Sequence, residues 1–256
     1  MAEGEGIGRA RGTDRMLDIM EFLGRHDHAV SAGEIAAALQ APRSSIYTIV
    51  DIMVTRGFLH RAPSGSISLG PKIAVLGLAF ERGSAILRKA RDIARDLSDK
   101  TGEIAELNVL DNWKQLVLIA ENGPSMNYLR SVEGGRFALP QTASGRFLLE
   151  GFDIAEISAN IPAADFTNGP GQPQAAQQLI EEGEAAAIRG FVCTRGLIDP
   201  NIACIAAPVR NASGKCVAVI SLVMTNARFD DMSEPFTSHV VDAAKALSAD
   251  MGDFTF

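Results

Sequence analysis

The sequence predicts an α+β protein with two domains joined by a helix, and three observations carry this prediction. Three short helical patterns followed by a hairpin pattern occupy the N-terminal part, which is the element order of a winged helix-turn-helix. A strongly apolar helical pattern then begins at Pro71. The remaining residues contain hairpin-like strand pairs with helices at both ends, which favours a domain with one mainly antiparallel sheet.

The composition is that of an ordinary globular protein. Of the 256 residues, 46% are hydrophobic and 21% are charged, so the chain can bury a sizeable core. No run of about 18 apolar residues occurs, and the N-terminus lacks the apolar segment of a signal peptide. We therefore expect a cytoplasmic protein without a membrane partner. The three cysteines, Cys193, Cys204 and Cys216, form no CxxC pair, so we expect reduced thiols and no metal site.

Charge is unevenly distributed along the chain. Residues 1–82 contain nine Lys or Arg and nine Asp or Glu, whereas residues 83–256 contain fifteen and twenty-two, which accounts for the whole net charge of −7. Between Arg43 and Lys72, four basic residues stand against one acidic residue, Asp51. Phosphate contacts need only local positive charge, so this stretch favours DNA binding. The alternative is chance clustering on a solvated surface.

The first two helical patterns have recognisable starts. Thr13 is a candidate cap for the first helix, and Gly24 ends it. Ser31 and Glu34 form the S-x-x-E pattern of a capping box at the start of the second helix. The apolar residues of the first helix lie on one face: Met16, Ile19, Met20 and Leu23.

The third helical pattern is the one expected to read DNA. Pro42 suits the first turn, and the apolar face consists of Ile46, Ile49, Val50 and Met53. Small hydroxyl groups beside Arg43 lie on the opposite face, where they let the backbone approach the major groove. The predicted DNA contacts are Arg43, Ser44, Ser45, Tyr47 and Thr48 on the helix and Arg61 and Ser64 on the hairpin. A small three-helix core without a DNA-binding role would give similar spacing.

The helix expected from Pro71 is apolar on several sides, with Leu76 and Phe80 among its large side chains. Such a helix must bury these side chains against something. Two readings are open, because the helix could pack on its own chain or form the contact of a dimer.

The C-terminal part is expected to begin with a long amphipathic helix from Ser84 and to close with a helix from Ser233. Between them we expect strands at 103–111, 115–120, 128–132 and 136–140, helices near 145, 153–159 and 174–189, and a strand pair at 202–209 and 215–224.

No catalytic constellation is recognisable in the sequence. Ser144 lies in T-A-S-G-R, which differs from the G-x-S-x-G nucleophile motif. His239 is the only histidine after residue 60, and no glycine-rich phosphate loop occurs. We therefore expect neither enzymatic activity nor a cofactor. A metabolic enzyme with an accessory helical domain is the alternative.

Three segments together resemble the IclR-type bacterial transcription regulators. They are TDRMLDIMEFL with SAGEIAAAL, RSSIYTIVDIMVTRGFL with SLGPKIAVLG, and DPNIACIAAPVRNASGKCVAVISL. The resemblance extends from about Arg9 to the closing helix. It implies a dimerising DNA-binding domain, a GAF-like α/β sensor domain for small metabolites, and the control of catabolic or transport operons by repression or activation.

On this resemblance we expect four parts: a flexible leader over 1–8, a winged helix-turn-helix over 9–70, a linker helix over 71–83 and an effector-binding domain over 84–256. The partners that it implies are double-stranded operator DNA, a small-molecule effector and a second copy of the chain. A homodimer is expected, with a dimer of dimers as a further option.

The resemblance also places an effector between the sheet and the loop 140–146. The residues expected around it are apolar Met126, Leu129, Phe137, Ile202 and Val223, polar Ser144, Thr194, Cys204 and Ser221, and the backbone amides of Ala143, Ser144 and Gly145. N–H groups at a helix start attract carboxylates. Thr194 and Arg195 also stand where relatives often carry an acid. We therefore expect a small carboxylate effector. The alternative is that these side chains only fill a core.

Two departures from the family pattern stand out. Thr48 and Ile49 follow Tyr47 where relatives often carry an arginine, which affects the base preference. The loop 140–146 reads PQTASGR where relatives often read His-Ala-small-small-x-Gly-Lys. The second departure keeps open a regulator whose sensor domain binds no ligand and serves only for oligomerisation.

Overall fold

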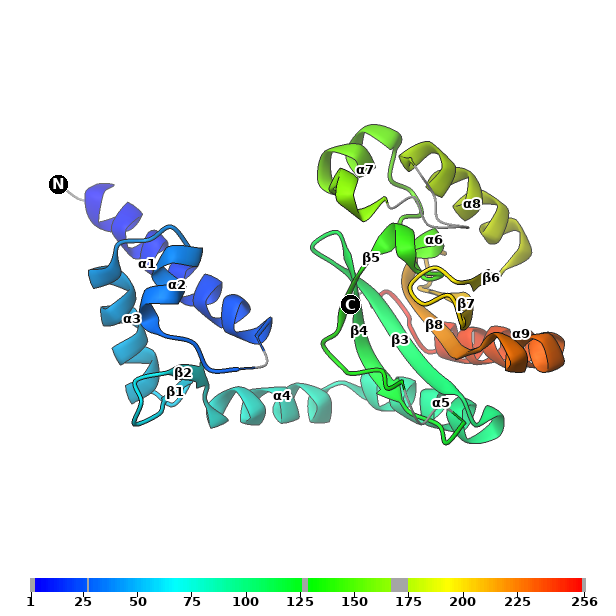
Figure 1. Ribbon diagram of the computed structural model, residues 1–256, viewed down its shortest axis with the longest axis horizontal. Coiled ribbons are helices and arrows are strands. Elements are labelled where there is room, and N and C mark those ends of the chain that lie inside the picture. Colours follow the sequence, from blue (N-terminus) through cyan, green and yellow to red (C-terminus); the bar gives the residue numbers. More distant parts are fainter. Residues whose placement is uncertain (1–2, 27, 126–128, 167–174, 255–256) are drawn as a thin grey trace. The chain divides into compact units, whose positions relative to one another are not determined.

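The computed structural model describes residues 3–26, 28–125, 129–166 and 175–254. The chain forms two compact units, Met1–Ser84 and Ala85–Phe256 (Figure 1). No helix within the described residues is long and apolar enough to cross a membrane. Each unit is described by itself.

The first unit is a winged helix-turn-helix, as predicted. Its elements are α1 (Glu3–Gly24), α2 (Ala32–Ala38), α3 (Arg43–Thr55), β1 (Leu59–Arg61), β2 (Ile67–Leu69) and α4 (Pro71–Gly83). The strands β1 and β2 pair in antiparallel register. The core joins the three helices to the hairpin, and its buried residues include Ile19, Ile35, Ile46, Val50, Met53, Leu59 and Ile67.

The capping box predicted for α2 is present, because the Ser31 side chain accepts from the Glu34 N–H and Glu34 accepts from the Ser31 N–H. The predicted start of the first helix at Thr13 is wrong. The helix α1 begins at Glu3, so residues 3–8, expected in a flexible leader, are helical. Extending an existing helix costs far less than nucleating one, which lets the packed part of α1 propagate towards the N-terminus.

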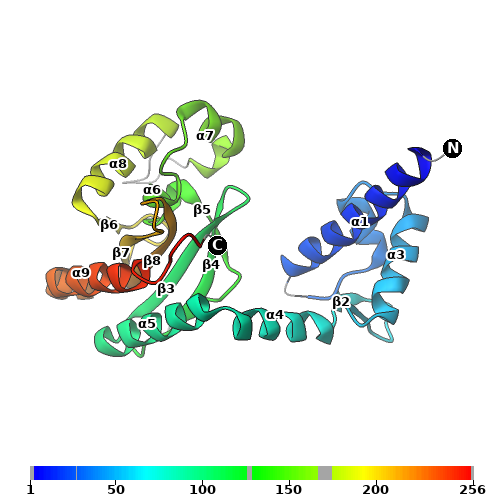
Figure 2. The ribbon, with the colours of Figure 1, turned by 180° about the vertical axis from the view of Figure 1, so that it is seen from behind.

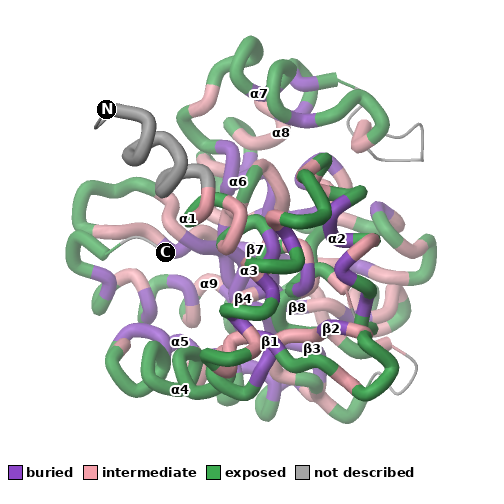
Figure 3. The backbone as a smooth tube through the Cα atoms, turned by 90° about the vertical axis from the view of Figure 1, so that its left-hand side faces the viewer, coloured by how far each residue is buried: buried purple, intermediate pink, exposed green. Residues whose placement is uncertain are grey.

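The helix α4 lies in the first unit and has Pro71 in its first turn. None of its residues is buried (Figure 3). Its large apolar side chains are among the most exposed of the described residues. This exposure excludes the reading in which α4 buries its apolar side chains within its own unit.

The second unit contains a six-stranded sheet in the order β5-β4-β3-β8-β7-β6, and every neighbouring pair is antiparallel. The strands are β3 (Ile104–Asp111), β4 (Lys114–Glu121), β5 (Arg136–Ala138), β6 (Val192–Arg195), β7 (Ile202–Arg210) and β8 (Cys216–Thr225). The helices are α5 (Ala85–Thr101), η1 (Leu139–Gln141), α6 (Gly145–Leu148), α7 (Ile154–Asn160), η2 (Ala163–Asp165), α8 (Ala176–Arg189) and α9 (Asn226–Ser248). This is the predicted α+β domain.

Helices cover both faces of the sheet. The long helices α5 and α9 pack on one face, where they share a core with β3, β7 and β8 (Figures 1 and 2). The shorter helices α6, α7 and α8 form a second core on the other side (Figure 1). The sheet therefore lies between two helical layers.

Three expectations for the second unit are wrong. Residues 129–132 form no strand, and residue 128 lies outside the described residues. The edge strand β6 was not expected, because four residues show too little alternation to be recognised. The helix α9 starts at Asn226 rather than at Ser233, because the Thr225 side chain accepts from the Arg228 N–H and caps the helix seven residues earlier.

Candidate DNA-contacting face and ligand cavity

The helix α3 presents a polar face to solvent. Its buried side carries Ile46, Val50 and Met53. The predicted DNA contacts lie on the other side, where Ser45 is partly buried and the rest are exposed: Arg43, Ser44, Ser45, Tyr47 and Thr48. Within the described residues Arg43 has no ion-pair partner, so its guanidinium is available to a phosphate.

The two predicted contacts on the hairpin differ in their surroundings. Arg61 Nη2 lies 2.5 Å from Asp51 Oδ1 on α3, so this ion pair ties the hairpin to the helix. Ser64 is exposed at the turn, and its hydroxyl lies 2.8 Å from that of Ser66. Arg61 therefore lies beside α3 and is already engaged by a carboxylate, whereas Ser64 contacts only the hairpin turn among the described residues.

The second unit contains a cavity of about 140 Å³. Its walls come from all six strands of the sheet and from the segments 129–131, 141–144 and 197–199. Engineered cavities of about 150 Å³ hold benzene, so a ligand of roughly one ring fits this volume.

The cavity brings together nine of the eleven residues predicted around the effector: Leu129, Phe137, Ala143, Ser144, Thr194, Ile202, Cys204, Ser221 and Val223. Met126 lies outside the described residues. Gly145 does not line the cavity, and its N–H donates to the carbonyl and hydroxyl oxygens of Thr142.

The cavity also contains three buried polar side chains that sequence reasoning missed, Glu106, Gln115 and Thr142. Glu106 on β3 is 7% exposed and Gln115 on β4 is 4% exposed. Glu106 and Asn108 occupy alternate positions of a strand that is otherwise largely apolar. Alternate positions share a face, so this pair was a usable signal for a polar site.

Hydrogen bonds join these side chains into one network centred on Asn108. Its Nδ2 donates to Glu106 Oε2 at 3.2 Å, to Ser221 Oγ at 3.0 Å and to Ser144 Oγ at 3.3 Å. Its Oδ1 accepts from Gln115 Nε2 at 2.9 Å. The network therefore connects β3, β4 and β8 to the residue that precedes α6.

Burial raises the pKa of the Glu106 carboxyl, because an ionised carboxylate is poorly solvated there. Ser131, Asn108 and Ser221 oppose this rise in part. Burial, with the nearby Glu106 as a smaller contribution, also raises the pKa of the Cys204 thiol. The cavity thus favours the uncharged forms of both groups.

The loop above the cavity is fixed by Arg146, which is 3% exposed. Its guanidinium donates to the carbonyl oxygens of Pro140 and Thr142 at 2.9 and 2.7 Å. It also pairs with Glu182 on α8 at 2.7 Å. A Cβ on Gly183 would lie 2.7 Å from the Arg146 carbonyl oxygen, so only glycine allows α8 to approach this closely.

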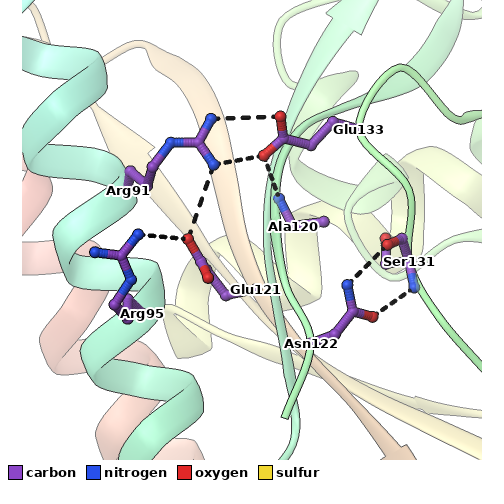
Figure 4. Close-up of polar contacts among 7 residues, drawn as sticks. All are labelled: Arg91, Arg95, Ala120, Glu121, Asn122, Ser131 and Glu133. Atoms are coloured by element: carbon purple, nitrogen blue, oxygen red, sulfur yellow. Dashed lines mark hydrogen bonds and ion pairs between the residues drawn. The ribbon is translucent and has the colours of Figure 1, made fainter.

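The segment that supplies residues 129–131 is anchored next to β4 (Figure 4). The Asn122 side chain donates to the Ser131 carbonyl oxygen and accepts from the Ser131 N–H, at 3.0 and 2.9 Å. Glu133 pairs with Arg91 on α5 at 2.6 Å and accepts from the Ala120 N–H. These contacts take the place of the strand pairing expected for this segment.

The charges around the cavity differ from those expected. Arg195 pairs with Asp230 and lies over the Phe229 ring, and it does not line the cavity. The charged or ionisable residues that do line it include Arg130, Asp199 and Glu106. Arg195 therefore gives no support to the charge argument for an anionic effector, and that argument left out Glu106. The charge of the effector stays a prediction.

Two protein-family models together match most of the chain. Residues 12–63 match the IclR helix-turn-helix domain, and residues 82–249 match the family described as bacterial transcriptional regulator IclR C-terminal. The chain is 29% identical to the HTH-type transcriptional regulator BhcR of Paracoccus denitrificans, over 96% of this chain and 89% of that protein. It is 25% identical to KipR of Bacillus subtilis, over 89% and 92%.

Solved structures show the same fold. A regulator from Alicyclobacillus acidocaldarius superposes with a TM-score of 0.81 at 20% identity, covering 93% of this chain and 98% of that one. An IclR homolog from Microbacterium hydrocarbonoxydans, complexed with 4-hydroxybenzoate, superposes with a TM-score of 0.76 at 25% identity and the same coverage.

Proposed function

Because this chain belongs to the IclR family of bacterial transcription regulators, we propose that it controls a catabolic or transport operon in response to a small carboxylate. Its matched domains and relatives are DNA-binding regulators and not enzymes. We assign operator binding to residues 9–70, the link to residues 71–83 and effector binding to residues 84–256.

The observation that carries the proposal is the cavity in the second unit, in which apolar walls surround a few convergent polar groups. This is the usual form of a small-molecule site. Nine of the residues proposed for effector binding surround it, and the fixed loop 140–146 closes one side. If the side chains around the cavity only filled a core, several of them would not be polar, because burying polar groups is costly.

Three features support a carboxylate. Arg130 lines the cavity and has no ion-pair partner among the described residues. Ala143 and Ser144 also line it, and within the described chain neither N–H donates to a backbone carbonyl. A structural relative at 25% identity was crystallised with 4-hydroxybenzoate, which carries a carboxylate.

We assign DNA contact to the polar face of α3 and to the adjoining hairpin, with Arg43, Ser44, Ser45, Tyr47, Thr48, Arg61 and Ser64 as the contacting residues. The buried face opposite them orients these side chains outward. A recognition helix of this kind lies in the major groove, while hairpin residues reach the backbone.

We assign dimerisation to α4. Val75, Leu76, Leu78 and Phe80 are 58, 50, 54 and 59% exposed, which leaves several large apolar side chains on one short helix without cover. Apolar surface of this kind marks an interaction site. A second copy fits best, because helix-turn-helix dimers read paired half-sites. A dimer of dimers is compatible with this contact.

A thermal-shift panel of small carboxylates on the full-length protein tests the proposed function. A ligand that binds only the folded state raises the melting temperature. At least one carboxylate is expected to do so in a concentration-dependent manner. If none does, the second unit serves assembly and not sensing.

A further inference from the structure

The cavity holds a buried hydrogen-bond acceptor without a partner. Gln115 uses its Nε2 to donate to Asn108, while its Oε1 is buried and has no hydrogen bond among the described residues. Nearly all buried polar atoms in proteins are paired. An unpaired acceptor on a cavity wall therefore indicates that a bound ligand brings the donor.

A second acceptor stands beside it. Glu106 accepts from Asn108 Nδ2 and from Ser221 Oγ, and both bonds end on Oε2. Neither of these donors occupies Oε1, and the Ser131 side chain is a further partner of the carboxyl. Glu106 is also the register partner of Ser221 across β3 and β8, so the sheet itself holds the carboxyl in place.

Asn108 fixes the geometry of both acceptors. It donates to Glu106 and accepts from Gln115, and it is fully buried, so Gln115 cannot turn away without leaving the Asn108 carbonyl oxygen unpaired. The two acceptors are therefore presented together and are preorganised for the same ligand group.

An effector whose only polar group is a carboxylate does not match the acceptors of Glu106 and Gln115. When ionised it only accepts hydrogen bonds, so it would leave Gln115 Oε1 unpaired. A hydroxyl group can both donate and accept. It would donate to Gln115 Oε1 and also form a hydrogen bond with the Glu106 carboxyl.

We propose that Glu106 and Gln115 are the specificity-determining residues for a hydroxyl group, which makes the effector a small hydroxy acid. This inference rests on the proposed function, because it places the effector in the same cavity. The volume of about 140 Å³ limits the ligand to roughly one ring or a short chain. An ammonium group is the competing donor, but it would require an ionised Glu106, which burial disfavours.

Matched acid pairs test the proposal, because each pair differs by one hydroxyl. The probes are 4-hydroxybenzoate with benzoate, 3-hydroxybutyrate with butyrate, and lactate with propionate, with alanine as the amino counterpart of lactate. Calorimetry on the full-length protein is expected to show at least one hydroxy acid binding roughly tenfold or more tightly than its partner.

Variants locate the discrimination. Gln115→Met removes the free acceptor at similar size, and Glu106→Leu removes the second acceptor. Each variant is expected to bind a hydroxy acid and its plain partner acid with nearly equal affinity. Glu106→Gln keeps an acceptor and is expected to keep most of the ratio. Gln177→Met makes the same change as Gln115→Met on the exposed surface of α8, outside the cavity, and serves as the matched control. If Glu106→Leu does not fold, Gln115→Met and Glu106→Gln decide.

The possible outcomes are distinguishable. Equal binding of hydroxy and plain acids overturns this inference and leaves the proposed function standing. Unchanged discrimination in Gln115→Met also overturns it. Tighter binding of alanine than of lactate would show that the effector donates through an ammonium group, which overturns the assignment of a hydroxyl. If no acid binds to the wild-type protein, the carboxylate effector and this inference fail together.

Discussion

The side-chain amide of Asn108 donates to the carboxyl of Glu106 at 3.2 Å, two residues earlier on the same strand. This contact makes Glu106 part of a fixed network, because Asn108 is itself held by Gln115 and lies within hydrogen-bond distance of Ser144. The polar wall of the cavity, formed by Glu106, Asn108, Gln115 and Ser221, is therefore built on the inner strands β3, β4 and β8 of the sheet and not on loops.

The raised pKa of Glu106 predicts a pH-dependent stability. In the unfolded chain the carboxyl ionises near its ordinary pKa of 4.5, whereas the folded protein keeps it protonated to higher pH. Glu106 therefore makes its full contribution to the free energy of unfolding below about pH 4.5. This contribution is lost as pH rises through the pKa that Glu106 has in the folded protein, at up to about 1.4 kcal/mol per pH unit.

Urea unfolding of the wild type and Glu106→Gln between pH 4 and 8 measures this effect. The wild type is expected to lose stability relative to the variant as pH rises. The other ionisable groups at the cavity, Arg130, Asp199 and Cys204, are the same in both proteins and cancel in the difference. A difference that does not change with pH would show that Glu106 is not buried as described.

The Arg146–Glu182 pair predicts a stability effect. Arg146→Met removes hydrogen bonds to two loop carbonyls and leaves Glu182 without its partner. We expect a loss of about 3 kcal/mol in the free energy of unfolding. Lys100→Ala is the control, since its exposed pair with Asp96 contributes less than about 1 kcal/mol. Equal losses of stability in both variants would contradict the role of Arg146 in fixing the loop 140–146.

Arg43 at the start of α3 predicts a phosphate contact. Arg43→Ala is expected to weaken DNA binding for all sequences and to lower the slope of log affinity against log salt by about one. Fluorescence anisotropy at several salt concentrations measures both quantities. Arg95→Ala removes the same charge from α5 and is expected to change neither. Equal affinity of the wild type and Arg43→Ala would refute the assignment.

The exposed face of α4 predicts a dimer. Light scattering at micromolar concentration is expected to give at least twice the chain mass of 27.2 kDa. Leu76→Glu together with Phe80→Glu should lower the mass, because charges on this face oppose burial. Ile188→Glu is the control, since this 89% exposed side chain lies on α8. A wild-type monomer would rule out the dimer contact.

Local patterns in the sequence were enough to predict the first unit. The spacing of Ile46, Val50 and Met53 defined one face of α3, and the Ser31–Glu34 box located the start of α2. Each of these signals lies within a few residues, so no knowledge of the tertiary structure was needed. The start of α1 was missed because the helix continues through residues without an amphipathic pattern.

The polar wall could be predicted only in part, because it depends on long-range pairing. Ser221 and Glu106 are 115 positions apart and meet because β3 and β8 are neighbours. Likewise, Arg195 directly follows the cavity residue Thr194 in the sequence, but its side chain turns to Asp230 on α9. The direction of such a side chain follows from the packing of distant elements.

The central claim is that a ligand in the cavity controls DNA binding, and DNA affinity with and without a hydroxy acid tests it most directly. The DNA is a fragment selected by the wild-type protein from a random pool, and the acid is the tightest binder among the matched pairs. For the wild type, we predict that the acid changes the Kd for DNA by roughly fivefold or more, in either direction. In Ser144→Tyr, whose ring would fill the cavity, the acid should have no effect. An unchanged Kd in the wild type, or the same change in Ser144→Tyr, would contradict the account.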